Sequence, residues 1–228
     1  MTAASGSESL ESVIRDAEAM LLDFDGVIAD SEPFFRRSWN GALEPWGHSI
    51  PERDYWKFWS SLGQGLEGEI ERRGLSSIDP ELARRRQREI YLGFVERGMI
   101  PLFPGSVELL EALDSGAGWA GRPYCIASNT PAPLVRDILS AGGAPVPNIV
   151  GGEGLEKKPS PAIFLEAASR LGRSPRSTVV LEDSWKGIAA AEKGGFISVL
   201  VKNRYNRDLE IESMFRVDGT GTLMEFFT

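Results

Sequence analysis

Short apolar segments alternate with amphipathic helical patterns along this chain, and the alternation limits the folds that it can adopt. Several of these segments lack polar residues at every second position, which is typical of strands covered on both faces. Repeated strand–helix units of this kind predict an α/β fold with a parallel sheet and helices on both sides. The segments expected to form strands are Ala19–Leu22, Tyr124–Ala127, Asn148–Val150, Thr178–Leu181 and Ile197–Val201.

Residues that favour helix ends mark two of the helices between these strands. Ser106 can cap a helix that carries Leu109 on its apolar face. Ser160 and Pro161 begin another helix, which is expected to end near Gly172.

The segment from Glu32 to about Pro101 contains no convincing strand. Its longest helix is expected to begin at Asp79, a good N-cap before Pro80, and to stop at Gly98. The other helical stretches are Phe34–Leu43, Tyr55–Leu62 and Leu66–Arg73. The sequence therefore predicts a core domain of residues 1–31 and 102–228, with an all-helical cap at residues 32–101 inserted after the first strand.

Composition excludes several classes of partner. Of the 228 residues, 42% are apolar and 25% are charged, which is ordinary for a globular protein. The net charge of −8 disfavours a nucleic-acid partner. No segment has membrane-spanning character, and Met1–Glu11 lacks the apolar core of a signal peptide. We therefore expect a cytoplasmic protein with no membrane partner, a monomer by default, in which the single cysteine, Cys125, is buried.

Polar residues gather where three of the predicted strands end. Asp23 and Asp25 follow the first strand, at a spacing that places both side chains on the same side of an extended backbone. Ser128-Asn129-Thr130 and Glu182-Asp183-Ser184 follow two further strands. Because ligands of open parallel sheets bind beyond the carboxyl ends of the strands, these groups are expected to share one site. Two carboxylates this close raise each other's pKa unless a cation lies between them, which indicates a metal-assisted catalytic site.

Four motifs in the chain resemble, in the same order, those of the haloacid dehalogenase superfamily. They are Asp23-Phe24-Asp25-Gly26-Val27-Ile28-Ala29-Asp30-Ser31-Glu32, Ser128-Asn129-Thr130, Lys158-Pro159-Ser160-Pro161 and Leu181-Glu182-Asp183-Ser184-Trp185-Lys186-Gly187-Ile188. The helical insertion resembles the small cap of the branch that contains β-phosphoglucomutase and phosphoglycolate phosphatase. The resemblance implies a Rossmann-like core, a mobile cap, dependence on Mg²⁺ and phosphoryl transfer.

The resemblance also implies a role for each motif residue. Asp23 corresponds to the nucleophile, which forms an aspartyl-phosphate. Asp25 corresponds to the acid that protonates the leaving oxygen and then acts as the base for water. Mg²⁺ would bind the Asp23 carboxylate, the Asp25 backbone carbonyl and Asp183, with Glu182 nearby and acting through water.

The remaining motif residues resemble a phosphate-binding cradle. They are the Ser128 hydroxyl, the Asn129 backbone N–H, the Lys158 ammonium and the backbone N–H groups of Gly26 and Val27. Positive and hydrogen-bonding groups of this kind balance the charge that develops on a transferred phosphoryl group.

The leading functional hypothesis is a Mg²⁺-dependent phosphatase for a small phosphorylated metabolite, such as a sugar phosphate or phosphoglycolate. Asp25 argues against a hydrolytic dehalogenase and against a phosphonoacetaldehyde hydrolase, because both replace this aspartate. A β-phosphoglucomutase-like phosphomutase stays open, although Glu32-Pro33-Phe34-Phe35-Arg36 lacks the histidine found after its first motif. A non-catalytic phospho-ligand binding protein is the alternative from another class, and it would need no acid/base at Asp25.

Several residues of the insertion have less specific interpretations. His48 is expected in a turn, as a surface imidazole. The aromatic residues Tyr55, Trp56 and Trp59 are expected to form the core of the cap rather than a substrate wall. The loop Leu62-Gly63-Gln64-Gly65 matches the general position of the cap specificity loop, and it equally suits an ordinary helix connection.

Overall fold

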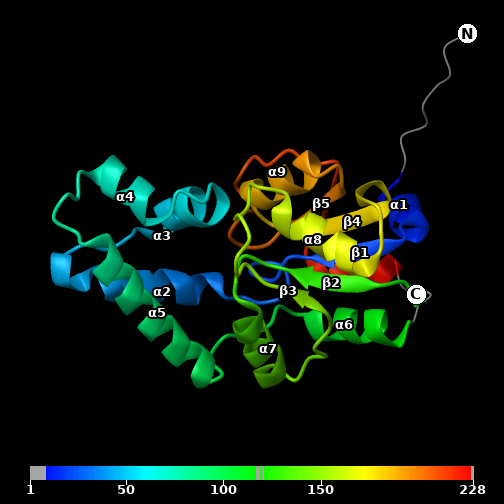
Figure 1. Ribbon diagram of the computed structural model, residues 1–228, viewed down its shortest axis with the longest axis horizontal. Helices are drawn as coiled ribbons and strands as arrows, with labels where there is room; N and C mark the ends of the chain where they lie inside the picture. Colours follow the sequence, from blue (N-terminus) through cyan, green and yellow to red (C-terminus); the bar gives the residue numbers. More distant parts are fainter. Residues whose placement is uncertain (1–8, 117–118, 120, 227–228) are drawn as a thin grey trace, which may run out of the picture.

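A computed structural model describes residues 9–116, 119 and 121–226 of the chain; residues 1–8 of the N-terminal segment considered above lie outside this description. The core is a six-stranded parallel sheet of order β3-β2-β1-β4-β5-β6 (Figure 1). Its strands are β1 (Ala19–Leu22), β2 (Tyr124–Ala127), β3 (Ile149–Val150), β4 (Thr178–Glu182), β5 (Ile197–Val201) and β6 (Phe215–Val217). The predicted α/β fold is thereby confirmed.

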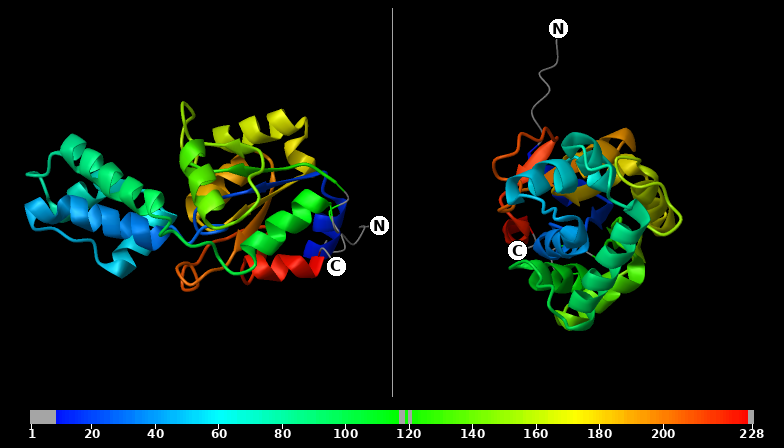
Figure 2. Two further views of the ribbon diagram at one scale, coloured as in Figure 1. Left: turned by 90° about the horizontal axis from the view of Figure 1, so that it is seen from below. Right: turned by 90° about the vertical axis from the view of Figure 1, so that its left-hand side faces the viewer.

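Helices cover both faces of this sheet (Figures 1 and 2). On one face the apolar core contains side chains of α1 (Leu10–Asp16), α6 (Ser106–Ser115) and α7 (Ala132–Ala141). On the other face α8 (Ala162–Leu171) and α9 (Trp185–Lys193) pack against a separate apolar cluster. Short 3-10 turns at η3 (Pro175–Ser177) and η4 (Thr220–Phe226) complete the core. The mainly apolar strand sequences follow from this coverage, and Cys125 is buried as expected, with 1% exposure.

Two local details differ from the sequence-based expectation. Ser106 does not cap α6; Gly105 occupies the N-cap position in a left-handed conformation (φ +82°), and Ser106 is the first helical residue. Glycine adopts this conformation without the steric cost of a side chain. The start of α6 is therefore set by the backbone conformation of Gly105, without a hydrogen bond from a capping side chain. Strand β6 was not expected, because Arg216 stands between Phe215 and Val217 and the segment shows no apolar run.

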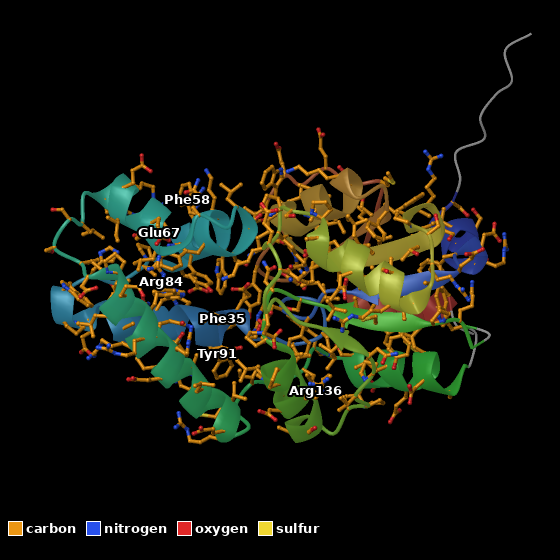
Figure 3. All side chains as sticks on the ribbon, in the orientation of Figure 1. Phe35, Phe58, Glu67, Arg84, Tyr91 and Arg136 are labelled. Atoms are coloured by element: carbon orange, nitrogen blue, oxygen red, sulfur yellow. The ribbon has the colours of Figure 1, made fainter. Side chains whose placement is uncertain are left out.

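The segment after β1 is helical, as predicted, and forms a lobe beyond the carboxyl ends of the strands (Figure 1). Its elements are α2 (Glu32–Leu43), η1 (Glu44–Trp46), α3 (Glu52–Asp54), the π-helical η2 (Tyr55–Ser61), α4 (Gly65–Arg73) and α5 (Pro80–Glu96). Asp79 caps α5 as expected, since its carboxylate accepts the N–H groups of Glu81 and Leu82 at 3.0 and 3.1 Å. An ion pair between Glu67 and Arg84 joins α4 to α5 (Figure 3).

The helical lobe has its own core around a buried carboxylate. Glu69, with 0% exposure, accepts the indole N–H of Trp59 at 3.1 Å and pairs with Arg72. His48 lies 2.9 Å from the same carboxylate through Nε2. The expectation of a surface imidazole is therefore met only in part, because the His48 side chain is 15% exposed and contacts the buried carboxylate of Glu69. A long-range contact across the lobe decided this, and the local sequence carries no sign of it.

The two connections between this lobe and the sheet run side by side. The N–H of Asp30 donates to the carbonyl of Pro101, and the N–H of Phe103 donates to the carbonyl of Ile28, each at 2.9 Å. This antiparallel pairing holds the helical lobe over the end of β1. Within the described ranges, no helix combines the length and the apolar character needed to cross a membrane.

The packing of α8 gives a stability test with a matched control. Phe164 is fully buried and lies edge-on to Phe196, with ring centroids 6.0 Å apart, whereas the adjacent Leu165 is 41% exposed. Phe164→Ala should lower the free energy of unfolding by about 3–5 kcal/mol. Leu165→Ala should change it by about 0.5 kcal/mol. Urea unfolding followed by circular dichroism measures both, and equal losses would contradict this packing.

Candidate active site

A buried lysine joins acidic groups from two strand ends. The Lys158 ammonium donates to Oδ1 of Asp23 at 2.8 Å, to Oε1 of Glu182 at 2.9 Å and to the carbonyl of Ala127 at 3.1 Å. Its Nζ also lies 4.4 Å from the centre of the Phe164 ring. Because Asp23 follows β1, Ala127 ends β2 and Glu182 ends β4, Lys158 connects three adjacent strands.

Burial dominates the electrostatics of this cluster. It raises the pKa of Asp23 to about 8, helped by the charge of Glu182 and opposed by Lys158. Burial and the charges of Glu182 and Asp23 also raise the pKa of Asp183. Burial would raise the pKa of Glu182 too, but Lys158 and the N–H of Ser184 outweigh it, and the pKa is lowered. The ammonium of Lys158 therefore balances only part of the negative charge.

The acidic cluster fits a hard divalent cation. Asp23, Glu182 and Asp183 are all buried, and each offers a carboxylate oxygen within 4.8 Å of the others. Oxygen ligands of this kind are those that Mg²⁺ prefers. A divalent ion would remove the repulsion that the single lysine leaves, so this triad can hold Mg²⁺.

Two glycines allow the carboxylates to approach the backbone. Gly26 has φ +86°, and a Cβ there would lie 2.0 Å from Oδ2 of Asp183. A Cβ on Gly187, in the first turn of α9, would lie 1.7 Å from Oε1 of Glu182. The N–H of Gly26 donates to the carbonyl of Ala29 at 2.9 Å, so it serves the turn after β1 in this structure. The absence of a side chain is therefore what Gly26 contributes directly to the site.

Asp25 lies in a separate ring of hydroxyl groups. Its carboxylate accepts hydrogen bonds from Ser31 at 2.5 Å, Ser128 at 3.0 Å and Thr130 at 2.6 Å. Ser128 in turn accepts the N–H of Thr130 at 3.0 Å. Two of these partners, Ser31 and Thr130, were absent from the candidate residues inferred from the sequence. Both lie inside quoted motifs, but only the fold shows that their hydroxyls turn toward Asp25.

A loop after β5 supplies further partners that sequence reasoning missed. Asn203 donates through Nδ2 to Oδ2 of Asp183 and to the carbonyl of Gly26, each at 2.9 Å. Asn206 donates to the carbonyl of Asp183 at 2.8 Å. Asparagines in an Asn-Arg-Tyr-Asn segment are typical of turns. Nothing in the local sequence therefore indicates that they hydrogen-bond to Asp183. Asn129 also acts structurally, since its Oδ1 accepts the N–H of Lys158 at 3.2 Å.

The acidic cluster opens into a cavity of about 710 Å³ between the sheet and the helical lobe. From the core it is lined by Asp23, Asp25, Ser128, Asn129, Lys158 and Asp183, among others. From the lobe it is lined mainly by Glu32, Phe35, Trp39, Tyr55, Trp59 and Tyr91. The rings of Phe35 and Tyr91 stack at 4.0 Å, between α2 and α5 (Figure 3). Tyr55 and Trp59 thus belong both to the core of the lobe, as expected, and to the cavity wall.

Glu32 is the one carboxylate that the described part of the lobe contributes to this wall. It is 8% exposed and accepts hydrogen bonds from the Tyr55 hydroxyl at 2.8 Å and the Ser60 hydroxyl at 2.9 Å. Burial raises its pKa, against the charge of Lys186 and these two hydrogen bonds. The contacts connect the start of α2 to η2 and fix the cavity wall next to Asp25.

The fold and the site define an enzyme with a Rossmann-like core, an acidic centre at its strand ends and a helical cap above it. Residues 17–195 match the haloacid dehalogenase-like hydrolase family, and the chain belongs to it. Members of this family typically use Mg²⁺.

Individual relatives are similar over most of the chain. Protein CbbY from Rhodobacter capsulatus is 26% identical over 84% of this chain and 88% of its own length. Fructose-1-phosphate phosphatase YqaB from Escherichia coli is 27% identical over 80% of this chain and 95% of its own. A crystal structure of a CbbY variant from Rhodobacter sphaeroides with xylulose-1,5-bisphosphate has a TM-score of 0.75 and 26% identity, covering 92% of this chain and 99% of that one.

The raised pKa values predict how metal binding depends on pH. A carboxyl whose pKa is raised by folding holds its proton more tightly in the folded state, so its ionisation costs stability as pH rises. Asp23 should therefore destabilise the metal-free protein progressively between about pH 4 and pH 8. Mg²⁺ should raise the melting temperature more at about pH 8 than at about pH 5, because it stabilises the ionised forms.

Scanning calorimetry with and without Mg²⁺ at both pH values measures this difference. Asp183→Asn should shrink the Mg²⁺-induced shift, whereas Asp137→Asn, at an exposed position of α7, should leave it unchanged. A shift that is equal at the two pH values would contradict the assignment of the triad.

Proposed function

We propose that this protein is a Mg²⁺-dependent phosphatase that hydrolyses a small phosphorylated metabolite through an aspartyl-phosphate. The observation that carries the proposal is the placement of Asp23 against Lys158, with Asp25 two residues further on in its own ring of hydroxyls. A nucleophile, a cation and a separately held carboxyl group all face one cavity. These are the parts that two-step phosphoryl transfer requires.

In the first step, an oxygen of the Asp23 carboxylate attacks phosphorus, and the bond from phosphorus to the leaving oxygen breaks. Asp25, in its protonated form, gives its proton to that oxygen, so the product leaves as an alcohol. Lys158 steadies Asp23 and offers positive charge to the phosphoryl oxygens. A positioned acid of this kind typically contributes about a hundred- to ten-thousandfold in rate.

In the second step, Asp25 acts as a base. Its carboxylate takes a proton from a water molecule, whose oxygen attacks the phosphorus of the aspartyl-phosphate. The bond between phosphorus and Asp23 breaks, inorganic phosphate forms, and Asp25 is again protonated for the next cycle. The hydroxyls of Ser31, Ser128 and Thr130 hold the carboxylate in place for both steps.

We assign the other groups around Asp23 to the metal and the phosphate. The metal ligands in this proposal are the Asp23 carboxylate, the Asp25 backbone carbonyl, Asp183 and, through water, Glu182. When bound, Mg²⁺ would supply positive charge next to the phosphoryl oxygens. Ser128, the Asn129 N–H and the Val27 N–H would bind the phosphoryl group, whereas the Gly26 N–H is held by the carbonyl of Ala29 and Gly26 leaves space for Asp183.

Residues 32–101 would act as a cap that closes over the substrate, with residues 1–31 and 102–228 as the catalytic core. The paired connections at Asp30–Pro101 and Ile28–Phe103 support this division, because they are the places where a lobe can move as a unit. A sugar phosphate is supported by the names of relatives that act on fructose 1-phosphate or bind xylulose-1,5-bisphosphate. The aromatic cavity wall suits the apolar faces of a sugar.

The nucleophile can be tested by substitution. Asp23→Asn should lower turnover of p-nitrophenyl phosphate by about a thousandfold or more, because an amide cannot form the aspartyl-phosphate. Asp16→Asn, at the exposed end of α1, is the control and should leave turnover unchanged. Calorimetry reports whether each variant is folded. Hydrolysis at the wild-type rate by folded Asp23→Asn would rule out this mechanism.

The fate of the phosphoryl group separates a phosphatase from a phosphomutase. A mutase must shield the aspartyl-phosphate from water, and the segment 32–36 offers Phe34 and Phe35 where a histidine is expected. With β-glucose 1-phosphate, a trace of the bisphosphate and Mg²⁺, phosphorus NMR should show inorganic phosphate that carries oxygen from labelled water. Efficient formation of glucose 6-phosphate with little free phosphate would instead support the mutase.

A further inference from the structure

Four basic side chains line the cavity, and they differ in how they are held. Lys158 is committed to Asp23 and Glu182. The side chains of Arg88, Lys157 and Lys186 have neither an ion pair nor a hydrogen bond within the part of the chain that the structure describes. Arg88 and Lys157 are exposed, whereas Lys186 is half-buried. Lys186 is therefore the cation that the fold holds in the wall without giving it a partner.

Lys186 lies where the cap meets the core. It is the second residue of α9, and its Cδ would be 3.1 Å from a Cβ on Gly63 of the cap loop. Gly63 has φ +68° and no side chain, which leaves room for the aliphatic part of Lys186. Next to it, the N–H of Trp185 lies 3.3 Å from the Ser61 hydroxyl of the cap. Contacts between the start of α9 and the cap loop therefore position Lys186 at the junction of core and cap.

Glu32 and Glu182, the two carboxylates on which the charge of Lys186 acts, already accept hydrogen bonds from other groups. Both oxygens of Glu32 accept hydroxyl hydrogen bonds within the cap. Those of Glu182 accept Lys158 and Ser184. The charge of Lys186 acts on both carboxyl groups through space, without a direct contact. Within the residues that the structure describes, the N–H groups of the Lys186 ammonium are therefore free to donate hydrogen bonds to a molecule in the cavity.

We propose that Lys186 binds a second anionic group, a carboxylate or a phosphate, on the leaving part of the substrate. This inference rests on the proposed function and narrows its substrate class to phosphomonoesters with two negatively charged ends. The transferred phosphoryl group is served by Asp23, Lys158 and Ser128 in the core. Lys186 is held against the cap loop instead, where the rest of the substrate would lie. Because Lys186 is half-buried, its ammonium can discriminate between charged and neutral groups more strongly than a fully exposed one.

The test compares Lys186→Met with Lys193→Met. Lys193 lies at the other end of α9, is exposed and contacts the carbonyl of Pro159 at 3.4 Å, so it is a matched control outside the cavity. Mg²⁺-dependent phosphate release is measured with four probes. Glucose 6-phosphate and p-nitrophenyl phosphate carry no charge outside the phosphoryl group, 2-phosphoglycolate carries a carboxylate, and fructose 1,6-bisphosphate carries a second phosphate.

Lys186→Met should lower kcat/KM about tenfold or more for the probes with a second anion, mainly through KM. It should change the neutral probes less than about twofold, and Lys186→Arg should restore most of the loss. Comparison of 2-phosphoglycolate with fructose 1,6-bisphosphate shows whether Lys186 prefers a carboxylate or a phosphate as the second anion. An equal loss for all four probes would overturn the inference, because Lys186 would then act on the transferred phosphoryl group. Wild-type preference for the neutral probes would also overturn it.

A binding measurement keeps this inference separate from the proposed function. If wild-type protein releases no phosphate from any probe, the phosphatase proposal fails. Quenching of tryptophan fluorescence from Trp39 and Trp59, which line the cavity, still reports binding. 2-Phosphoglycolate should then bind about tenfold more tightly than inorganic phosphate, and Lys186→Met should abolish that difference. Equal affinities in wild-type protein would reject the second anion site.

Discussion

The contact of Lys158 with Asp23 and Glu182 is the interaction on which the rest of the site depends. Buried carboxylates are costly unless they are paired and hydrogen-bonded. Lys158 meets this requirement at the ends of two neighbouring strands and anchors itself on the carbonyl of Ala127. Because it balances only part of the charge, the cluster can hold a divalent cation. The structural ion pair and the candidate metal site therefore share the same groups.

Close approach of backbone to carboxylate ties this cluster to the cap. Gly26 has no Cβ where the Asp183 carboxylate lies, and Asn203 holds both of them. Two residues further on, the ring of Tyr205 lies 4.2 Å from that of Trp56 in the cap. The Tyr205 hydroxyl also donates to Asp30, next to the connection between the cap and the core. One short loop thus contacts the acidic cluster, the connection and the cap.

The helices and strands that could be predicted were those with a recognisable local sequence pattern. Mainly apolar segments predicted the strands β1 to β5, and Asp79 followed by Pro80 predicted the start of α5. Strand β6 and the N-cap of α6 were missed. Arg216 interrupts the apolar pattern of β6, and the cap at Gly105 depends on backbone conformation rather than on a side chain.

The sequence by itself determined which acids stand at the strand ends, because Asp23, Asp25, Glu182 and Asp183 directly follow or end apolar runs. Only the tertiary structure decided what each acid touches. The hydroxyl of Thr130 reaches Asp25 across 105 positions of the chain. Such contacts depend on which strands are neighbours in the sheet, β2 and β4 beside β1, and on how the cap folds back over them. Local periodicity specifies elements, whereas the order of strands and the direction of side chains at their ends come from packing the whole chain.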